Sequence, residues 1–133
     1  MTNKDIDDIV YLIGSSDYHN LYSKEEFVDM IKTPYSLQQY LIVRAKTKPI
    51  CFATWAFPNA ANIKEYFFHN KFPKEGFYGN GNTPWIIDFI SLGVVRNTTI
   101  GFRTVKSMLS EKGYKKFFWF RPQIPKLGFH RWS

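Results

Sequence analysis

Histidine is the side chain best suited to proton transfer near neutral pH, and this chain contains three. His19 lies in the stretch "GSSDYHNLYS", residues 14 to 23, among small polar residues and between two segments with helical patterns. His69 follows a helical segment and His130 lies near the C-terminus, and both are expected at the surface. His19 is therefore the candidate general base, although a histidine beside serines is also typical of a solvated loop.

An aspartate inside an apolar strand is the second candidate. In "WIIDFISL", residues 85 to 92, strand alternation directs Trp85, Ile87 and Phe89 to one face and Ile86, Asp88 and Ile90 to the other. Both faces are apolar, which predicts a central strand, and a buried ionised carboxylate is costly unless it is paired. Asp88 is then either structural, bonded to an arginine or to backbone amides, or paired with a histidine such as His19, whose tautomer it would fix.

Further residues have types that can support such a site. Ser15 and Ser16 are expected to end a helix, and one of them can donate a hydrogen bond near His19. Arg121 follows four consecutive aromatic residues at the end of a predicted strand, where a guanidinium either covers apolar surface or binds an anion. Cys51 lies in a strand, where a cysteine is usually a small core residue and less often a reactive thiol.

The sequence contains no pattern for a resident metal or cofactor. The three histidines share no metal-ligand spacing, and a single cysteine excludes both a cysteine-based zinc site and an internal disulfide. It also contains no Gly-x-Ser-x-Gly nucleophile motif, no phosphate-binding glycine loop and no dinucleotide fingerprint. We therefore expect neither a metal nor a permanently bound cofactor.

The elements that must position these residues are a mixed set of helices and strands. Apolar spacing predicts a helix over residues 6–13, and a second helix begins after Ser23, which forms a capping-box pattern with Glu26. His19 therefore falls in a connection between two helices. The remaining predicted elements are a hairpin from "QQYLIVRAK" and "PICFATWAF", a helix over 59–71 capped by Asn59, a loop over 70–84, the strand over 85–92, a helix over 98–113, a strand over 115–120 and an irregular tail.

This order predicts a single domain over residues 1–133, of mixed α/β (α+β) class, with one mainly antiparallel sheet flanked by helices. A length of 133 residues and a hydrophobic content of 44% suit one substantial core. No apolar run reaches the roughly 18 residues of a membrane span. The acidic stretch "MTNKDIDDIV" also lacks the pattern of a secretory signal. We therefore expect a cytoplasmic protein without stable membrane insertion.

Charge is unevenly distributed along the chain, whose formal net charge is +7. Residues 1–30 hold seven acidic and two basic residues, whereas residues 112–133 hold six lysines and arginines and no acid. A basic surface favours an acidic partner. Nucleic acid, an anionic membrane surface and a small acidic carrier protein are the candidates at this point.

Four blocks of the sequence resemble one protein family. In order, these are "SSDYH", "YLIVRAKTKPICFATWA", "PWIIDFISLGV" and "KKFFWFRPQ". They are similar, in order and approximate spacing, to blocks of the bacterial lysine acyltransferases that activate RTX haemolysins and cytolysins. The resemblance extends over roughly residues 5 to 130.

The resemblance implies a GNAT-like fold, in which a bent antiparallel sheet opens a cleft between two strands. It implies transfer of a fatty acyl group from acyl-acyl carrier protein to the ε-amines of internal lysines in a protoxin, by enzymes that form homodimers. The family's catalytic histidine and aspartate fall on His19 and Asp88, its serine falls on Ser16, and an arginine falls on Arg121. The connection "SLGVVRNTTIG" lacks the glycine pattern that holds coenzyme A, which disfavours that donor.

Two other interpretations remain open from the sequence. The first is a GNAT-type enzyme that acylates a different protein or peptide amine, which would depend on the same His19 and Asp88. The second is a non-catalytic module that binds nucleic acid, which the net charge of +7 and the aromatic content of 19% favour. Against it, the aromatic residues gather in apolar runs such as "FFWF" and do not alternate with basic residues. We therefore expect no nucleic-acid partner.

Overall fold

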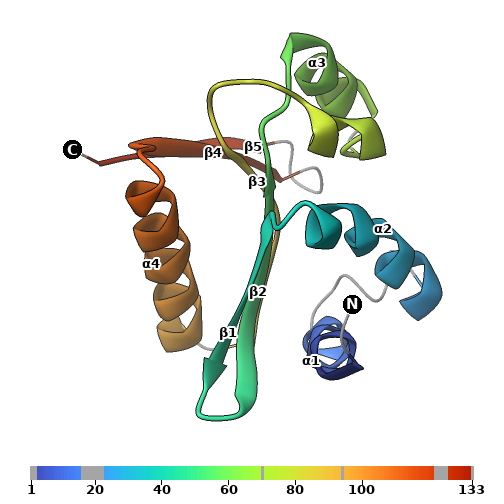
Figure 1. The fold of residues 1–133 in the computed structure, drawn as a ribbon, viewed down its shortest axis with the longest axis vertical. Helices are drawn as coiled ribbons and strands as arrows, with labels where there is room; N and C mark the ends of the chain where they lie inside the picture. The colour runs from blue at the N-terminus through green and yellow to red at the C-terminus, as the bar shows by residue number, and fades with distance from the viewer. Residues whose placement is uncertain (1–2, 16–22, 70, 94, 122–125, 133) are drawn as a thin grey trace.

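The structure is a computed structural model that describes residues 3–15, 23–69, 71–93, 95–121 and 126–132. A five-stranded sheet forms its centre, with α1, α2 and α3 on one side and α4 on the other (Figure 1). The elements in chain order are α1 (Asn3–Gly14), α2 (Lys24–Ser36), β1 (Tyr40–Ala45), β2 (Lys48–Ala56), α3 (Ala60–His69), the 3₁₀ helix η2 (Lys74–Tyr78), β3 (Trp85–Ser91), α4 (Val95–Glu111), β4 (Lys116–Arg121) and β5 (Lys126–Arg131).

The sheet has the order β1-β2-β3-β4-β5. All neighbouring strands are antiparallel except β3 and β4, which are parallel and are connected by the crossover helix α4. This confirms the predicted α+β class with a mainly antiparallel sheet. The GNAT-like character implied by the resemblance stays a prediction.

Two apolar clusters cover the two faces of the sheet. The cluster on the side of α1 and α2 consists of Ile9, Leu12, Ile13, Phe27, Ile31, Phe52 and Ile90. The cluster on the side of α4 consists of Ala53, Trp55, Ile86, Val105, Leu109 and Phe117. Because β2 and β3 contribute to both clusters, they are central strands, as the sequence predicts for residues 85 to 92.

A β-bulge in β3 changes which residues share a face. Thr54 pairs with Asp88 whereas the next residue of β2, Trp55, pairs with Ile86, so Ile87 is an extra residue in β3. Ile86 consequently packs in the cluster on the side of α4, while Ile90 packs in the cluster on the side of α1 and α2. The prediction that Ile86, Asp88 and Ile90 share one face is therefore wrong for Ile86, because uniform alternation does not allow for a bulge.

The predicted helix starts are confirmed at two positions. The Ser23 side chain accepts a hydrogen bond from the Glu26 backbone N–H at 3.1 Å, and the Glu26 carboxylate accepts one from Ser23 N–H. Asn59 caps α3 in the same reciprocal way with Asn62. These local bonds satisfy N–H groups that a helix start leaves without intrahelical partners, so the short-range sequence pattern is sufficient to locate them.

A helix start, a loop and the tail are among the features that differ from prediction. The helix α4 begins at Val95, three residues before the predicted start at 98, and the predicted loop over 70–84 contains η2. The tail, expected to be irregular, instead forms strand β5, which pairs with β4 from Lys126 to Arg131. Proline and glycine in the tail favoured a loop, but Gly128 lies opposite Trp119 and leaves room for its indole ring, with which any Cβ would collide.

Candidate active site

The buried carboxylate predicted in the strand is held by one hydroxyl group. Asp88 in β3 is 8% exposed, and its cross-strand partner Thr54 in β2 is 0% exposed. The Thr54 hydroxyl donates a hydrogen bond to Asp88 Oδ2 at 2.6 Å and accepts one from the Asp88 backbone N–H at 3.1 Å. Neither an arginine nor a histidine among the described residues bonds to this carboxylate, so the predicted structural partner is replaced by a threonine.

Two opposing effects act on the acidity of Asp88. Burial raises the pKa of Asp88 above its ordinary value of 3.8, and the hydrogen bond from Thr54 opposes this and lowers it. Within the described part of the chain, the side-chain hydrogen bond to this carboxylate is made to Oδ2, which leaves Oδ1 able to accept a further N–H. A carboxylate in this setting can orient and stabilise a neighbouring imidazolium.

The sheet changes its pairing at the position of Asp88. Strands β3 and β4 pair at only two positions, Trp85 with Phe118 and Ile86 with Trp119. The bulge at Ile87 follows directly, so Asp88 lies just beyond the point where β4 stops pairing with β3. Irregular pairing next to a functional side chain is a recurrent use of β-bulges.

The remaining predicted site residues are His19, Ser16 and Arg121. His19 and Ser16 lie outside the described residues. Arg121 is the last residue of β4, where its backbone pairs with Lys126, and its side chain also lies outside the described part. The structure therefore tests the setting of Asp88 but does not test its pairing with His19.

The helix ends on either side of the connection that contains His19 are well packed. Ile13 in the last turn of α1 and Phe27 in the first turn of α2 belong to the same apolar cluster as Ile90. Ile90 is two residues beyond Asp88 and lies on the same face of the sheet. The helices that flank residues 16–22 thus both pack on the sheet face that carries the carboxylate.

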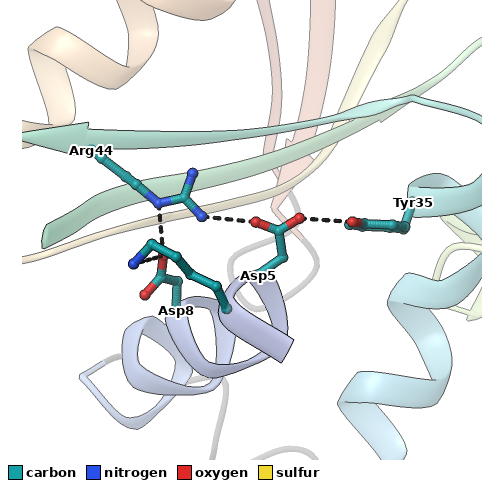
Figure 2. Close-up of polar contacts among 5 residues, drawn as sticks. Asp5, Asp8, Tyr35 and Arg44 are labelled. Atoms are coloured by element: carbon teal, nitrogen blue, oxygen red, sulfur yellow. Dashed lines mark hydrogen bonds and ion pairs between the residues drawn. The ribbon is translucent and has the colours of Figure 1, made fainter. Parts of the chain in front are cut away.

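An ion-pair network, here called the Arg44 cluster and consisting of Asp5, Asp8, Tyr35 and Arg44, holds α1 against β1 (Figure 2). Arg44 Nε donates to Asp8 Oδ2 at 2.7 Å, and its Nη2 donates to Asp5 Oδ1 at 2.8 Å. The Tyr35 hydroxyl in α2 donates to the other oxygen of Asp5 at 2.7 Å. Hydrogen bonding to Asp8, and then to Asp5, raises the pKa of Arg44.

The Arg44 cluster was not predicted, because the residues that its hydrogen bonds join are 30 to 39 positions apart along the chain. The carboxylates of Asp5 and Asp8 lie three positions apart on one face of α1, and this was the available signal. Arg44 in turn was a charged residue in an otherwise apolar strand. The cluster attaches α1 and the end of α2 to the same edge of the sheet, and so fixes the helices that precede and follow residues 15–23.

Cys51 is a core residue and is confirmed as such. It lies in β2 and is 0% exposed, and burial raises the pKa of its thiol from 9.0 to about 12. Its side chain packs against Gly101 of α4, which places it on the face of the sheet opposite Asp88. A thiol with so high a pKa carries almost no thiolate at neutral pH and is a poor nucleophile.

The remaining histidines and acidic residues do not form a metal site in the described ranges. His69 ends α3 and is exposed, as predicted. His130 is half-buried in β5 and contacts the rings of Phe102, Phe117 and Trp132, so its expected surface position is wrong. No group of three histidine, cysteine or acidic side chains with metal-binding geometry occurs among the residues that the structure describes.

An aromatic surface extends from the start of β3 on the side of α3. Phe67 of α3 contacts Trp85 and Phe120, with ring centroids 6.0 and 4.8 Å apart. Phe118 of β4 stacks on Trp85 at 5.1 Å and contacts Phe129 of β5 at 5.0 Å. Phe67 and Phe129 are 41% and 49% exposed, so part of this apolar surface faces solvent next to the strand that carries Asp88.

Comparison with models of protein families identifies the family to which the chain belongs. The family model HlyC, described as the RTX toxin acyltransferase family, matches residues 3–115. The chain therefore belongs to the RTX toxin acyltransferase family, and its activity is that of an acyltransferase. The match includes Thr54 and Asp88, whereas Arg121 and β5 lie beyond it. A comparison with curated proteins gives no match.

None of the helices in the described ranges has the length and apolarity needed to cross a membrane.

Proposed function

We propose that this protein transfers a fatty acyl chain from acyl-acyl carrier protein to the ε-amines of internal lysines in an RTX-type protoxin. His19 acts as the general base and Asp88 orients it. The observation that carries this proposal is the buried Asp88 carboxylate, held by Thr54 on the sheet face against which α1 and α2 pack. Membership of the RTX toxin acyltransferase family supports the reaction class.

The chemistry of the acceptor requires a base. A lysine ammonium has a pKa near 10.4, so presenting the free amine at pH 7 costs roughly 4 to 5 kcal/mol. A histidine that removes the proton as the amine attacks the thioester lowers this barrier, and a carboxylate on its second nitrogen stabilises the imidazolium that results. The proton passes from the amine to the histidine and then to the leaving thiol as the carbon–sulfur bond breaks.

A covalent variant uses the same two residues. In it His19 attacks the thioester first, and the carbon–sulfur bond breaks to release the carrier thiol. The lysine amine then attacks the acyl-histidine, which breaks the bond between the acyl group and the imidazole and frees His19. Both routes require Asp88 to be ionised. Peptide mapping after rapid quenching, with donor present and acceptor absent, distinguishes them, because an acyl group accumulates on His19 only in the covalent route.

The donor proposal rests on charge. The carrier is a small acidic protein, and the chain has a net charge of +7 with its basic residues concentrated toward the C-terminus. Lys116 of β4 lies directly opposite Arg131 of β5, and none of the described residues that line the pocket of about 330 Å³ beside them and Lys115 is acidic. Like charges paired across two strands repel each other, and an acidic partner would relieve this repulsion.

The acyl chain has a candidate surface next to the carboxylate. Phe67, Trp85 and Phe118 form part of the aromatic surface between α3, β3 and β4, and this surface is only partly covered by protein. Covering it with a hydrocarbon chain is favourable at about 25 cal/mol for each Å² of apolar area removed from water. This supports a medium or long acyl chain over an acetyl group.

The alternatives receive less support. The aromatic residues of β4 pack against other rings, with Phe117 0% exposed, so they do not present bases with a stacking surface as a nucleic-acid module would. A GNAT-type enzyme acting on another protein or peptide amine would use the same catalytic pair and differ only in its acceptor. The homodimer implied by the resemblance stays a prediction.

Co-expression with a candidate RTX protoxin tests the proposal. We expect the intact mass of the protoxin to increase by one or more fatty acyl groups, located on lysine by peptide mapping, and to remain unmodified with the Asp88→Asn enzyme. Unmodified protoxin with an active wild-type enzyme would contradict the proposed acceptor. Acylation of a different co-purified amine would then favour the alternative acyltransferase.

A further inference from the structure

We propose that Thr54 is a positioning residue of the acyltransfer site, whose hydroxyl fixes the Asp88 carboxylate in one orientation and favours its ionised form. The inference rests on the proposed function, in which an ionised Asp88 orients His19. It names a residue on a second strand as part of the acid–base system. Thr54 acts through Asp88 and does not contact the reacting groups.

The Thr54 hydroxyl makes two hydrogen bonds in the described part of the chain, and both are with Asp88. Its single hydroxyl proton is donated to Asp88 Oδ2 at 2.6 Å, and its oxygen accepts the Asp88 backbone N–H at 3.1 Å. A threonine side chain is stiff about its first torsion, and this one is 0% exposed among packed neighbours. The two bonds therefore hold one carboxylate oxygen and one backbone position of the same residue in fixed relation.

The sheet register explains why the partner stands at position 54. Thr54 and Asp88 are directly opposite in the antiparallel pair, and the bulge at Ile87 follows immediately. Ala53 and Trp55 point to the face of α4, so Thr54 is the residue of this part of β2 that points to the Asp88 face. If β3 kept Ile87 and alternated regularly, Asp88 would share the face of Ile86 and would not meet the Thr54 hydroxyl.

The electrostatic setting gives the hydroxyl its second role. Burial favours the protonated carboxyl, and the bond from Thr54 is the effect that opposes it. Several charged groups on the neighbouring helices pair with each other or with β1: Asp5 and Asp8 of α1 bond to Arg44 of β1, and Asp29 of α2 pairs with Lys32. No charged side chain in the described ranges shifts the pKa of Asp88, so Thr54 is the described group that favours its ionised form.

Two substitutions distinguish a positioning role of Thr54 from a purely structural one. Thr54→Val keeps the branched shape and removes the hydroxyl, whereas Thr54→Ser keeps the hydroxyl and removes a methyl group. The first measurement is the Asp88 pKa in the free enzyme, by carboxyl ¹³C NMR titration assigned with Asp88→Asn. We expect Thr54→Val to raise this pKa and Thr54→Ser to leave it close to that of the wild type.

The second measurement is the pH profile of acyl transfer. In Thr54→Val the acid limb should move to higher pH, with about tenfold lower kcat on the acid side, partial recovery on the alkaline side and unchanged KM for donor and acceptor. Thr54→Ser should restore the wild-type profile. An unshifted Asp88 pKa together with an unshifted acid limb in Thr54→Val would overturn the inference.

A third variant covers the case in which Thr54→Val does not fold. Thr54→Cys has nearly the same volume and a weaker donor, and should give an intermediate Asp88 pKa. An Asp88 pKa equal to that of the wild type in Thr54→Cys would also overturn the inference. Because the NMR titration needs no substrate, it decides the role of Thr54 even if the wild type acylates no lysine, a result that would reject the proposed function alone.

Discussion

Gly101 of α4 lies directly against Cys51 of β2, so closely that a Cβ at position 101 would collide with the Cys51 sulfur. The contact closes the one thiol of the chain between a strand and a helix, on the sheet face opposite Asp88. It decides between the two interpretations that the sequence left open for this cysteine. The thiol fills space in the core.

Cys51→Ser should therefore retain most of the acyltransferase activity. A hydroxyl in place of the buried thiol is left without a strong hydrogen-bond partner, which is expected to lower the free energy of unfolding by about 1–3 kcal/mol. Thermal denaturation and acyl-transfer assays check the two expectations. Loss of turnover by a folded Cys51→Ser protein, or an acyl-thioester trapped on Cys51, would assign the nucleophile to the thiol.

His19→Ala should reduce acyl transfer by about 100-fold or more, the usual contribution of a general base. We expect little change in thermal stability, because a side chain in a connection between helices contributes little packing energy. His69→Ala is the matched control, since His69 is an exposed histidine at the end of α3 and should retain full activity. Equal activities of the two variants would show that His19 is a surface residue.

Asp88→Asn should abolish most activity without loss of stability. Because burial raises the pKa of Asp88, the folded state binds the proton more tightly than the unfolded chain, and the free energy of unfolding falls as pH rises from 3.8 through this raised pKa. Asparagine carries no charge and still accepts the Thr54 hydroxyl. A melting temperature at neutral pH equal to or above that of the wild type, with severely reduced turnover, is the expected pair of results.

Asp88→Ala provides the contrast. It leaves the buried Thr54 hydroxyl without its acceptor and should lower the free energy of unfolding by about 1–3 kcal/mol. Full activity in a stable Asp88→Asn protein would show that this carboxylate has only a structural role.

Arg44→Met should destabilise the protein and loosen α1. The substitution keeps a long apolar side chain but leaves Asp5 and Asp8 without their guanidinium partner, and hydrogen bonds to charged groups contribute about 1.5–3 kcal/mol. Arg44→Lys should recover only part of this loss, because an ammonium lacks the planar fork that contacts both carboxylates (Figure 2). A double-mutant cycle with Asp8→Asn measures the coupling, and a coupling near zero would reduce the cluster to a surface contact.

Acyl transfer from the carrier protein should slow between low and moderate ionic strength, because salt screens the attraction between an acidic carrier and a basic surface. Acyl-coenzyme A with the same acyl chain should be a poor donor. Lys116→Glu, with Lys115→Glu as a second site, should weaken the dependence on salt. Lys48→Glu is the control, because Lys48 is the first residue of β2 and the turn between β1 and β2 lies away from β4 and β5 (Figure 1). Equal rates from both donors without a salt effect would reject the carrier proposal.

Short-range patterns predicted a large part of the fold. The capping box at Ser23, the hairpin of β1 and β2 and the apolar strand around Asp88 all follow from neighbours within a few residues, and the structure contains each of them. The buried state of Asp88 was predicted for the same reason. Local physics decides these features, so a local pattern is enough to find them.

The features that were missed depend on residues far apart in the sequence. Thr54 and Asp88 are separated by 34 positions, and only the register of β2 with β3 brings them together. A threonine within "ICFATWA" was the available signal, since it is the one polar residue of that apolar run. Strand β5 was missed because Gly128 weakens a strand by propensity but is required here by the indole of Trp119.

The bulge in β3 also limits how this site can change in evolution. Deletion of Ile87 would leave a regular strand in which Ile86 still pairs with Trp55 and Asp88 still pairs with Thr54, so the extra residue can be lost without turning the carboxylate toward the other helix layer. Deletion of Phe89 would instead turn either Asp88 or Ile90 toward the other layer, because side chains alternate along a regular strand. In an alignment of such sequences, a gap in this strand is therefore expected at position 87 and not between Asp88 and Ile90.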